Sequence, residues 1–150
     1  MRVAGAEDVG VIAMLRALWT GGSHDLEFAD RLCDWLRREG ARRTTWLAML
    51  DNTPAGMSSM FEYWRMPRPH TPDSRWGYLS NMFVREELRD RGIGSALLTV
   101  LIEEAERRGY ARLVLSPSER AVPFYQRAGF VVPDQLAGGD RLLVRPSRVR

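Results

Sequence analysis

The chain has 150 residues, and its 22 basic residues against 19 acidic ones give a formal net charge of +3. A hydrophobic content of 45% and a charged content of 27% are typical of a soluble globular protein, so one domain over residues 1–150 is expected. All the basic residues are arginine, which excludes a lysine Schiff base, and the single cysteine excludes an intrachain disulfide.

The same composition disfavours several partners and sites. No apolar run is long enough to cross a membrane, and neither a signal peptide nor an anchor is expected. A lone cysteine is typical of a reducing compartment, so a cytoplasmic location is expected. Two histidines and one cysteine without ligand spacing predict no metal site. The small positive charge is weak evidence for nucleic-acid binding, because pairs such as Arg37-Arg38 fit a solvated helix end better.

The first forty residues predict a short strand followed by two helices. The strand is Arg2-Val3-Ala4, and apolar residues from Val9 to Trp19 then recur at helical spacing. A second helix is predicted over about Leu26 to Glu39, where Cys33 is interpreted as a packing residue. Its apolar face consists of Phe28, Leu32, Trp35 and Leu36.

A β-hairpin and a long irregular segment are predicted next. Residues 44–50 and 55–63 have strand character on either side of a turn at Asp51-Asn52-Thr53-Pro54. Three prolines then forbid a regular element over residues 64–75.

The central feature of the sequence is a strand, a glycine-containing turn and a helix. Tyr78 to Val84 is an apolar strand-like run, and Gly92 and Gly94 follow it after a charged turn. Gly109 is expected to end the helix in a left-handed conformation. One face of the helix carries Ile93, Ala96, Leu97, Val100, Leu101 and Ala105.

This arrangement predicts a pyrophosphate site at the start of the helix. The first N–H groups of a helix have no internal partner, and glycines let a phosphate approach them closely. Arg85, Arg89 and Arg91 surround the turn with suitable donors. A glycine turn with solvated arginines explains the pattern equally well. The Rossmann fingerprint fails because Leu97 replaces its third glycine, and the P-loop fails because the chain has no lysine.

The last third of the chain predicts three strands and one helix. Ala111–Ser116 has the composition of a buried strand, and a helix is expected from Pro117 until Gly129. Phe130–Val132 and Arg141–Val144 are predicted as short strands. The element order mixes hairpins with crossover connections, which indicates a mixed sheet covered by helices.

Two stretches resemble the signatures of the GNAT superfamily of N-acyltransferases. Arg89-Asp90-Arg91-Gly92-Ile93-Gly94 fits the family's acyl-CoA-binding pattern, Arg/Gln-x-x-Gly-x-Gly/Ala. Downstream, Phe124-Tyr125 followed by Gly129-Phe130 is similar to the second signature. The resemblance implies an α/β (α+β) fold: a mixed, mostly antiparallel twisted sheet of six to seven strands, splayed between its central strands and flanked by four helices.

The resemblance also implies acetyl-CoA as cosubstrate, without a metal. Pantetheine would pair with the backbone of Met82, Phe83 and Val84, and an N–H near Met82 would polarise the thioester carbonyl. Ser118 stands where many relatives carry an asparagine that contacts the cofactor. Tyr125 matches the residue that contacts the cofactor and protonates the leaving thiolate, although a core tyrosine is the alternative. The pyrophosphate would be held by the amides of Arg89, Asp90, Arg91, Gly92, Ile93, Gly94 and Ser95.

The predicted reaction also needs a group that accepts the proton of the amine. The central strand offers Ser80 and Asn81 but no carboxylate. Glu62, on the neighbouring strand, is therefore the candidate base, directly or through water, although an edge charge explains it equally well. His24 and His70 fit solvated surface positions better than a catalytic role.

The predicted reaction is transfer of an acetyl group to a primary amine of a small molecule or peptide, by direct attack in a ternary complex. The alternatives within enzymes are transfer of a longer acyl group and transfer to a hydroxyl. A catalytically silent acyl-CoA-binding module is the alternative outside enzymes, and the missing strand carboxylate leaves it open. A homodimer is left open. An acidic entrance for a cationic amine and a solvated helix face are both compatible with Asp25, Glu27, Asp30 and Asp34.

Overall fold

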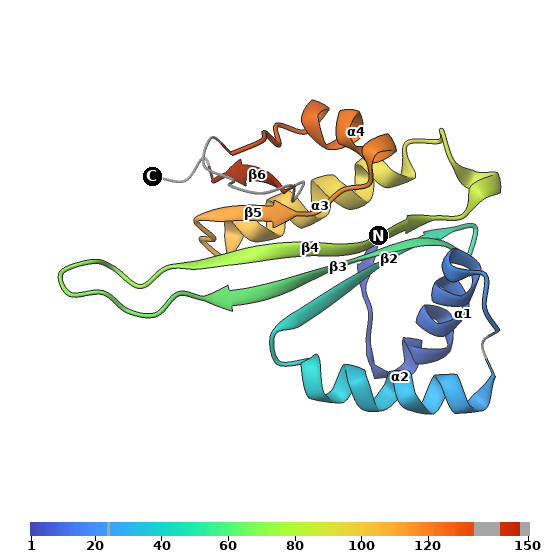
Figure 1. The fold of residues 1–150 in the computed structure, drawn as a ribbon. Helices are drawn as coiled ribbons and strands as arrows, with labels where there is room; N and C mark the ends of the chain where they lie inside the picture. The colour runs from blue at the N-terminus through green and yellow to red at the C-terminus, as the bar shows by residue number, and fades with distance from the viewer. Residues whose placement is uncertain (24, 134–141, 148–150) are drawn as a thin grey trace. The chain divides into compact units, whose positions relative to one another are not determined.

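The computed structural model describes residues 1–23, 25–133 and 142–147. Within these residues the helices are α1 (Val9–Thr20), α2 (Leu26–Glu39), α3 (Ile93–Arg107) and α4 (Val122–Arg127) (Figure 1). The strands are β1 (Arg2–Val3), β2 (Arg43–Leu50), β3 (Thr53–Trp64), β4 (Arg75–Val84), β5 (Arg112–Leu115) and β6 (Leu143–Pro146). Short 3-10 turns cover Ala6–Asp8, Glu86–Leu88 and Glu119–Ala121.

The strands form one mixed sheet in the order β1-β2-β3-β4-β5-β6. β1 is antiparallel to β2 and β5 is antiparallel to β6, whereas β4 and β5 are parallel. The registered pairs of the parallel ladder are Gly77 with Leu113 and Tyr78 with Val114, and β4 continues beyond them to Val84. The predicted mixed, mostly antiparallel sheet with four helices is therefore confirmed.

The chain divides into two compact units that alternate along the sequence. The first contains residues 1–60 and 81–100, and the second contains residues 61–80 and 101–150. Strands β3 and β4 and helix α3 each run from one unit into the other.

The core of the first unit lies between α1 and the inner strands. It is built from Ile12, Leu15, Leu47, Met57 and Phe83, and residues of α2 pack against it. Figure 1 shows α1 and α2 side by side next to β2. Helix α2 contributes no fully buried residue, although the sequence predicts an apolar face for it.

Local signals in the sequence account for the boundaries of these elements. The Asp25 carboxylate accepts a hydrogen bond from the Phe28 N–H at 2.9 Å and so caps α2. The turn residues Asp51 and Asn52 have φ values of 47° and 62°, as a two-residue type I′ hairpin turn requires. The predicted hairpin is confirmed, with its second strand starting at Thr53.

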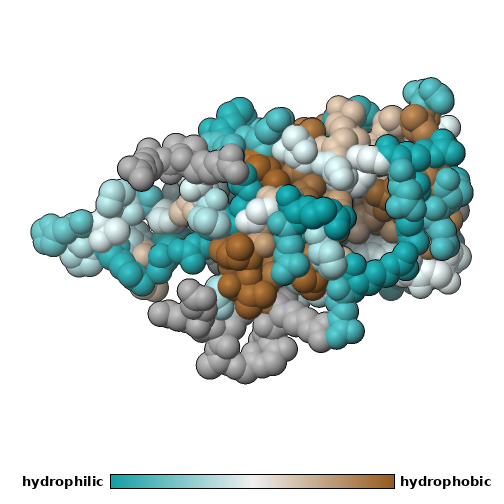
Figure 2. Space-filling view, turned by 90° about the horizontal axis from the view of Figure 1, so that it is seen from above, coloured by the Kyte–Doolittle hydropathy of each residue, from teal (hydrophilic) through white to brown (hydrophobic). Residues whose placement is uncertain are grey.

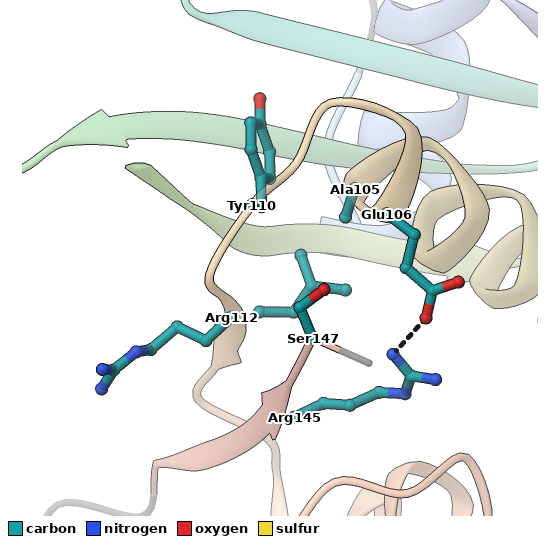
Figure 3. Close-up of a pocket in the computed structure, with 7 residues that line it drawn as sticks. Ala105, Glu106, Tyr110, Arg112, Arg145 and Ser147 are labelled. Carbon is teal, nitrogen blue, oxygen red and sulfur yellow. Dashed lines mark hydrogen bonds and ion pairs between the residues drawn. The ribbon is translucent and has the colours of Figure 1, made fainter. Parts of the chain in front are cut away.

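The second unit contains the end of α3, helix α4 and strands β5 and β6. Gly109 has a φ of 69°, so the predicted left-handed end of the long helix is confirmed. Arg145 of β6 extends toward Glu106 of α3 and pairs with it at 3.0 Å, while Arg112 points away (Figure 3). The cavity beside this ion pair has about 10 Å³, which is room for a water molecule and not for a substrate.

The predictions were less accurate in this unit. The predicted helix from Pro117 is confirmed only from Val122, after the 3-10 turn. The strand predicted at residues 130–132 is reduced to a bridge between Val131 and Val144. The last strand starts at Leu143, and Arg141 of the predicted strand lies outside the described residues.

The surface seen in Figure 2 is mainly hydrophilic, with hydrophobic residues in a few smaller areas. Across the described residues, no helix has the length and apolar character needed to cross a membrane.

Candidate functional site

The first turn of α3 presents free backbone donors beside an open turn. The Ala96 N–H donates to the Gly92 carbonyl at 2.9 Å, so the N–H groups of Ile93, Gly94 and Ser95 precede the first helical hydrogen bond. Gly92 has a φ of 76°, and a Cβ built on it would meet no atom within 4 Å. The predicted segment therefore has the conformation and the open space that a diphosphate needs.

The three arginines of the predicted phosphate turn have different environments. Arg85 pairs with Glu87 and donates to the Pro54 carbonyl, so it anchors the turn to the preceding hairpin. Arg89 is exposed and makes only long contacts, to Glu86 and to the Val84 carbonyl. Arg91 is exposed and has no ion-pair partner among the described residues. Of the three, Arg89 and Arg91 fit an anionic ligand, whereas Arg85 does not.

The end of β4 is held in place by two features that the sequence analysis did not identify. Asn81 has a φ of 54°, a left-handed conformation inside the strand that is typical of a β-bulge. A Cβ built on Gly56 of β3 would lie 2.5 Å from the Phe83 carbonyl oxygen, so only glycine allows the two strands this approach. Phe83 is buried and stacks on Trp19 of α1 with ring centroids 5.9 Å apart. The backbone of Met82, Phe83 and Val84 thus has a defined position.

Tyr125 of α4 is a buried tyrosine whose hydroxyl has no hydrogen-bond partner among the described residues. Its ring packs edge-on against Phe124 and Phe130, at centroid distances of 5.0 and 5.7 Å. Burial raises the pKa of Tyr125 to about 12, so the phenol carries its proton at neutral pH. The Tyr125 hydroxyl is not among the fully buried side-chain oxygens that lack a partner, so it reaches solvent and is accessible to a ligand.

Ser118, the other predicted cofactor contact on this part of the chain, is exposed and precedes the 3-10 turn. Its hydroxyl makes no capping hydrogen bond to that turn, which leaves the side chain able to bond a ligand.

Glu62 lies in a hydrogen-bond network at the end of β3. The Tyr110 hydroxyl donates to its Oε2 atom at 2.5 Å, the Trp64 Nε1–H donates to Oε1 at 2.8 Å, and Arg75 lies 3.5 Å away. Burial alone would raise the pKa of Glu62, but the hydrogen bonds from Tyr110 and Trp64 outweigh burial and lower it. A carboxylate with both oxygens occupied and a lowered pKa is a poor proton acceptor. Its role as the base stays a prediction, and these contacts oppose it.

We expect Glu62→Gln to lower the free energy of unfolding by about 1–3 kcal/mol, because it disrupts hydrogen bonds to a half-buried carboxylate. Since the pKa of Glu62 is lowered by folding, its contribution is present at neutral pH and is lost as the pH falls through the folded-state pKa. Urea unfolding at pH 7 and in acid checks this, with exposed Glu103→Gln as the control. A collapse of the acidic limb of the rate profile, with unchanged stability, would instead support Glu62 as the base.

The remaining polar candidates that lie within the described residues are exposed. His70 lies in the turn between β3 and β4 with a φ of 56°, and His24 lies outside the described residues. Asp34 pairs with Arg37 at 2.9 Å, and Asp25 caps α2. The four acidic residues at α2 that were considered for an acidic entrance are all exposed, which favours their interpretation as a solvated helix face. Among the described residues, no three histidine, cysteine or acidic side chains are grouped as metal ligands would be.

Comparison with known proteins identifies the family to which this chain is similar. The model of the acetyltransferase (GNAT) family matches residues 10–130. A glucosamine 6-phosphate N-acetyltransferase from Trypanosoma brucei brucei is 33% identical over 54 residues. That match covers 36% of this chain and only 37% of the relative.

Solved structures with similar folds include two acetyltransferases. A predicted acetyltransferase from Clostridium acetobutylicum, solved with acetyl-CoA, superposes with a TM-score of 0.74 and 21% identity, covering 93% of this chain and 94% of that one. Glucosamine-6-phosphate N-acetyltransferase from Arabidopsis thaliana gives a TM-score of 0.72 and 17% identity, covering 92% and 95%. At these identities the likeness establishes the fold.

Proposed function

We propose that this chain, which belongs to the acetyltransferase (GNAT) family, transfers an acetyl group from acetyl-CoA to a primary amine of a small molecule or peptide. The amine nitrogen attacks the thioester carbonyl directly in a ternary complex. The C–N bond forms, the C–S bond breaks, and the proton lost by the amine is balanced by the proton gained by the departing sulfur. The observation that carries the proposal is the open, glycine-bearing start of α3, with its free N–H groups.

Each group of residues would have a separate task. The amides from Arg89 to Ser95 would hold the pyrophosphate, and the positive end of the α3 dipole would favour its charge. The backbone of Met82, Phe83 and Val84 would pair with pantetheine as an added strand does, and a Met82 N–H would donate to the carbonyl oxygen as negative charge develops there. Tyr125 would donate its phenolic hydrogen to the leaving sulfur.

The proposal assigns no carboxylate base. An amine that is neutral at the working pH attacks without one, and the occupied carboxylate of Glu62 is consistent with this route. The lack of an assigned carboxylate base is also compatible with a second candidate function, an acyl-CoA-binding module that does not catalyse transfer.

Release of free thiol from acetyl-CoA distinguishes the two functions. We expect amine-dependent thiol release with some members of a panel that includes amino acids, aryl amines, amino sugars with and without phosphate, and peptides. Calorimetric binding of coenzyme A without thiol release from any amine would support the silent module. Parallel assays with propionyl- and butyryl-CoA define the acyl length. Residence in the cytoplasm and a homodimer remain predictions.

A further inference from the structure

A cavity of about 300 Å³ lies in the first unit, where α1 and α2 face strands β2, β3 and β4. This volume is at the lower end of the about 300–1,000 Å³ typical of small-molecule pockets, so the cavity suits a ligand of amino-acid size. Its lining residues are Ile12, Arg16, Phe28, Leu32, Trp35, Leu36, Thr45, Met57, Ser59 and Asn81.

The cavity explains why α2 has an apolar face but no buried residue. Phe28, Leu32, Trp35 and Leu36 all line the cavity, and each is only half-buried. A helix that packs on a filled core buries such a stripe, because protein interiors are close-packed. The apolar wall of α2 therefore has room for an apolar group of a ligand, and Trp35 and Phe28 suit a large or flat one.

Among the described residues that line the cavity, Arg16 is the only charged one. Its guanidinium donates to the Asn81 Oδ1 atom at 3.3 Å and lies 4.8 Å from the ring centroid of Trp19. Among the described residues it has no carboxylate partner. These two contacts orient the guanidinium and leave further N–H donors for a planar anion, of which a carboxylate is the best geometric match.

The sheet side of the cavity is polar but uncharged. The hydroxyls of Thr45 and Ser59 lie 2.8 Å apart and bond to each other, and both residues are buried. The lining residues that the structure describes include no acidic side chain. A polyamine carries a second positive charge besides its reacting amine. That charge would lie near the Arg16 guanidinium with no carboxylate beside it to compensate the repulsion.

Asn81 joins the cavity to the proposed point of reaction. It is the left-handed residue of β4, and Met82, which carries the proposed carbonyl-polarising N–H, follows it directly. An anion bound by Arg16 thus lies at the end of the cavity next to this strand segment. The reacting amine and the anion of the acceptor must therefore be close together in the molecule.

We infer that the acceptor is an α-amino acid with a large apolar side chain. Its carboxylate binds Arg16, its side chain occupies the cavity along α2, and its α-amino group is directed toward the Met82 segment. The α-nitrogen bonds to the acetyl carbon as the C–S bond breaks, giving an N-acetyl amino acid and the free thiol of coenzyme A. This inference rests on the proposed function, which it narrows to one substrate class.

The test compares L-phenylalanine with L-phenylalaninamide, which lacks the carboxylate charge and has a more acidic α-ammonium group, and with L-aspartate, which has a second carboxylate in place of the apolar side chain. The rates are compared at a pH at which both α-amino groups are neutral. We expect kcat/KM for phenylalanine to exceed both others by at least about 10-fold.

Arg16→Gln should reduce the ratio of kcat/KM for phenylalanine to kcat/KM for phenylalaninamide toward one, mainly through KM. Exposed Arg31→Gln on α2 is the matched control. Equal kcat/KM for the acid and the amide, or a ratio that survives Arg16→Gln, would overturn the inference.

A binding measurement separates this inference from the proposed function. With coenzyme A present, phenylalanine should raise the melting temperature of the native protein, and phenylalaninamide should raise it less. If phenylalanine binds through Arg16 but no acetyl group is transferred, the acceptor site stands and the transferase proposal fails. If other amines are acetylated while phenylalanine neither binds nor reacts, the transferase stands and the inference is overturned. Absence of both binding and transfer also overturns the inference.

Discussion

Replacement of Gly92 by aspartate should lower the affinity for coenzyme A by at least about 100-fold. The proposed ligand is a diphosphate at the first turn of α3, and an aspartate would place a carboxylate in the open space beside Gly92. At an effective dielectric constant of 20, two like charges about 5 Å apart repel by about 3 kcal/mol, which exceeds the roughly 2.7 kcal/mol of a 100-fold change. Isothermal titration calorimetry with coenzyme A measures the effect directly.

The substitution is chosen so that loss of binding is not loss of folding. Asp tolerates the left-handed conformation of Gly92 better than most residues, and its charge is favourable at a helix N-terminus. Gly92→Asn is the matched control, because it has the same shape without the charge and should lose much less affinity. Coenzyme A heats that are equal for wild type and Gly92→Asp, with far-UV circular dichroism unchanged, would remove the pyrophosphate site and the proposed function with it.

The phosphate turn was predictable because its signals are local. Apolar residues at helical spacing fix α3, and the glycines at both of its ends mark left-handed positions that few other residues occupy. The hairpin turn at Asp51 and Asn52 is local in the same sense, since two adjacent positive φ values select those residue types. Local patterns of this kind are read directly from spacing.

The features that were missed depend on residues distant in the sequence. Tyr110 bonds Glu62 across 48 positions, so the carboxylate appears free in the sequence and is occupied in the fold. An isolated glycine in a strand, Gly56, is a signal of close backbone approach, but its partner Phe83 is identified only by the pairing of β3 with β4. Asn81 is a residue type that tolerates a left-handed conformation, yet nothing in its neighbours places a bulge there.

Helix α2 shows that a correctly predicted apolar helix face does not reveal a cavity beside it. The stripe of Phe28, Leu32, Trp35 and Leu36 was correctly predicted to share a face, and a buried core was the natural interpretation. Periodicity gives the direction in which side chains point, but it gives no measure of the volume in front of them. The half-burial of the stripe and the cavity of about 300 Å³ come only from the packing of α1, α2 and the sheet.

Replacement of Tyr125 by phenylalanine should lower kcat by about 10- to 150-fold and leave the affinity for coenzyme A nearly unchanged. A hydrogen bond to a charged atom contributes about 1.5–3 kcal/mol, and the developing thiolate is the charge that Tyr125 would stabilise. With its pKa raised to about 12 by burial, the phenol is protonated throughout the pH range of the assay. The rate profile of the wild type should therefore rise as the amine loses its proton and show no falling limb from this group below about pH 11.

Tyr125→Phe distinguishes a role as proton donor from a role in packing, because it removes the hydroxyl and keeps the aromatic ring. Phenylalanine keeps the edge contacts with Phe124 and Phe130, and no hydrogen bond within the described residues is lost, so the free energy of unfolding should change by less than about 0.5 kcal/mol. Tyr63→Phe, which removes a more exposed hydroxyl, is the control for turnover. A Tyr125→Phe enzyme with wild-type kcat would show that another group protonates the sulfur. A large loss of stability would show that the hydroxyl has a structural partner. A fall in kcat at constant stability and constant cofactor affinity would support stabilisation of the leaving sulfur by the Tyr125 hydroxyl.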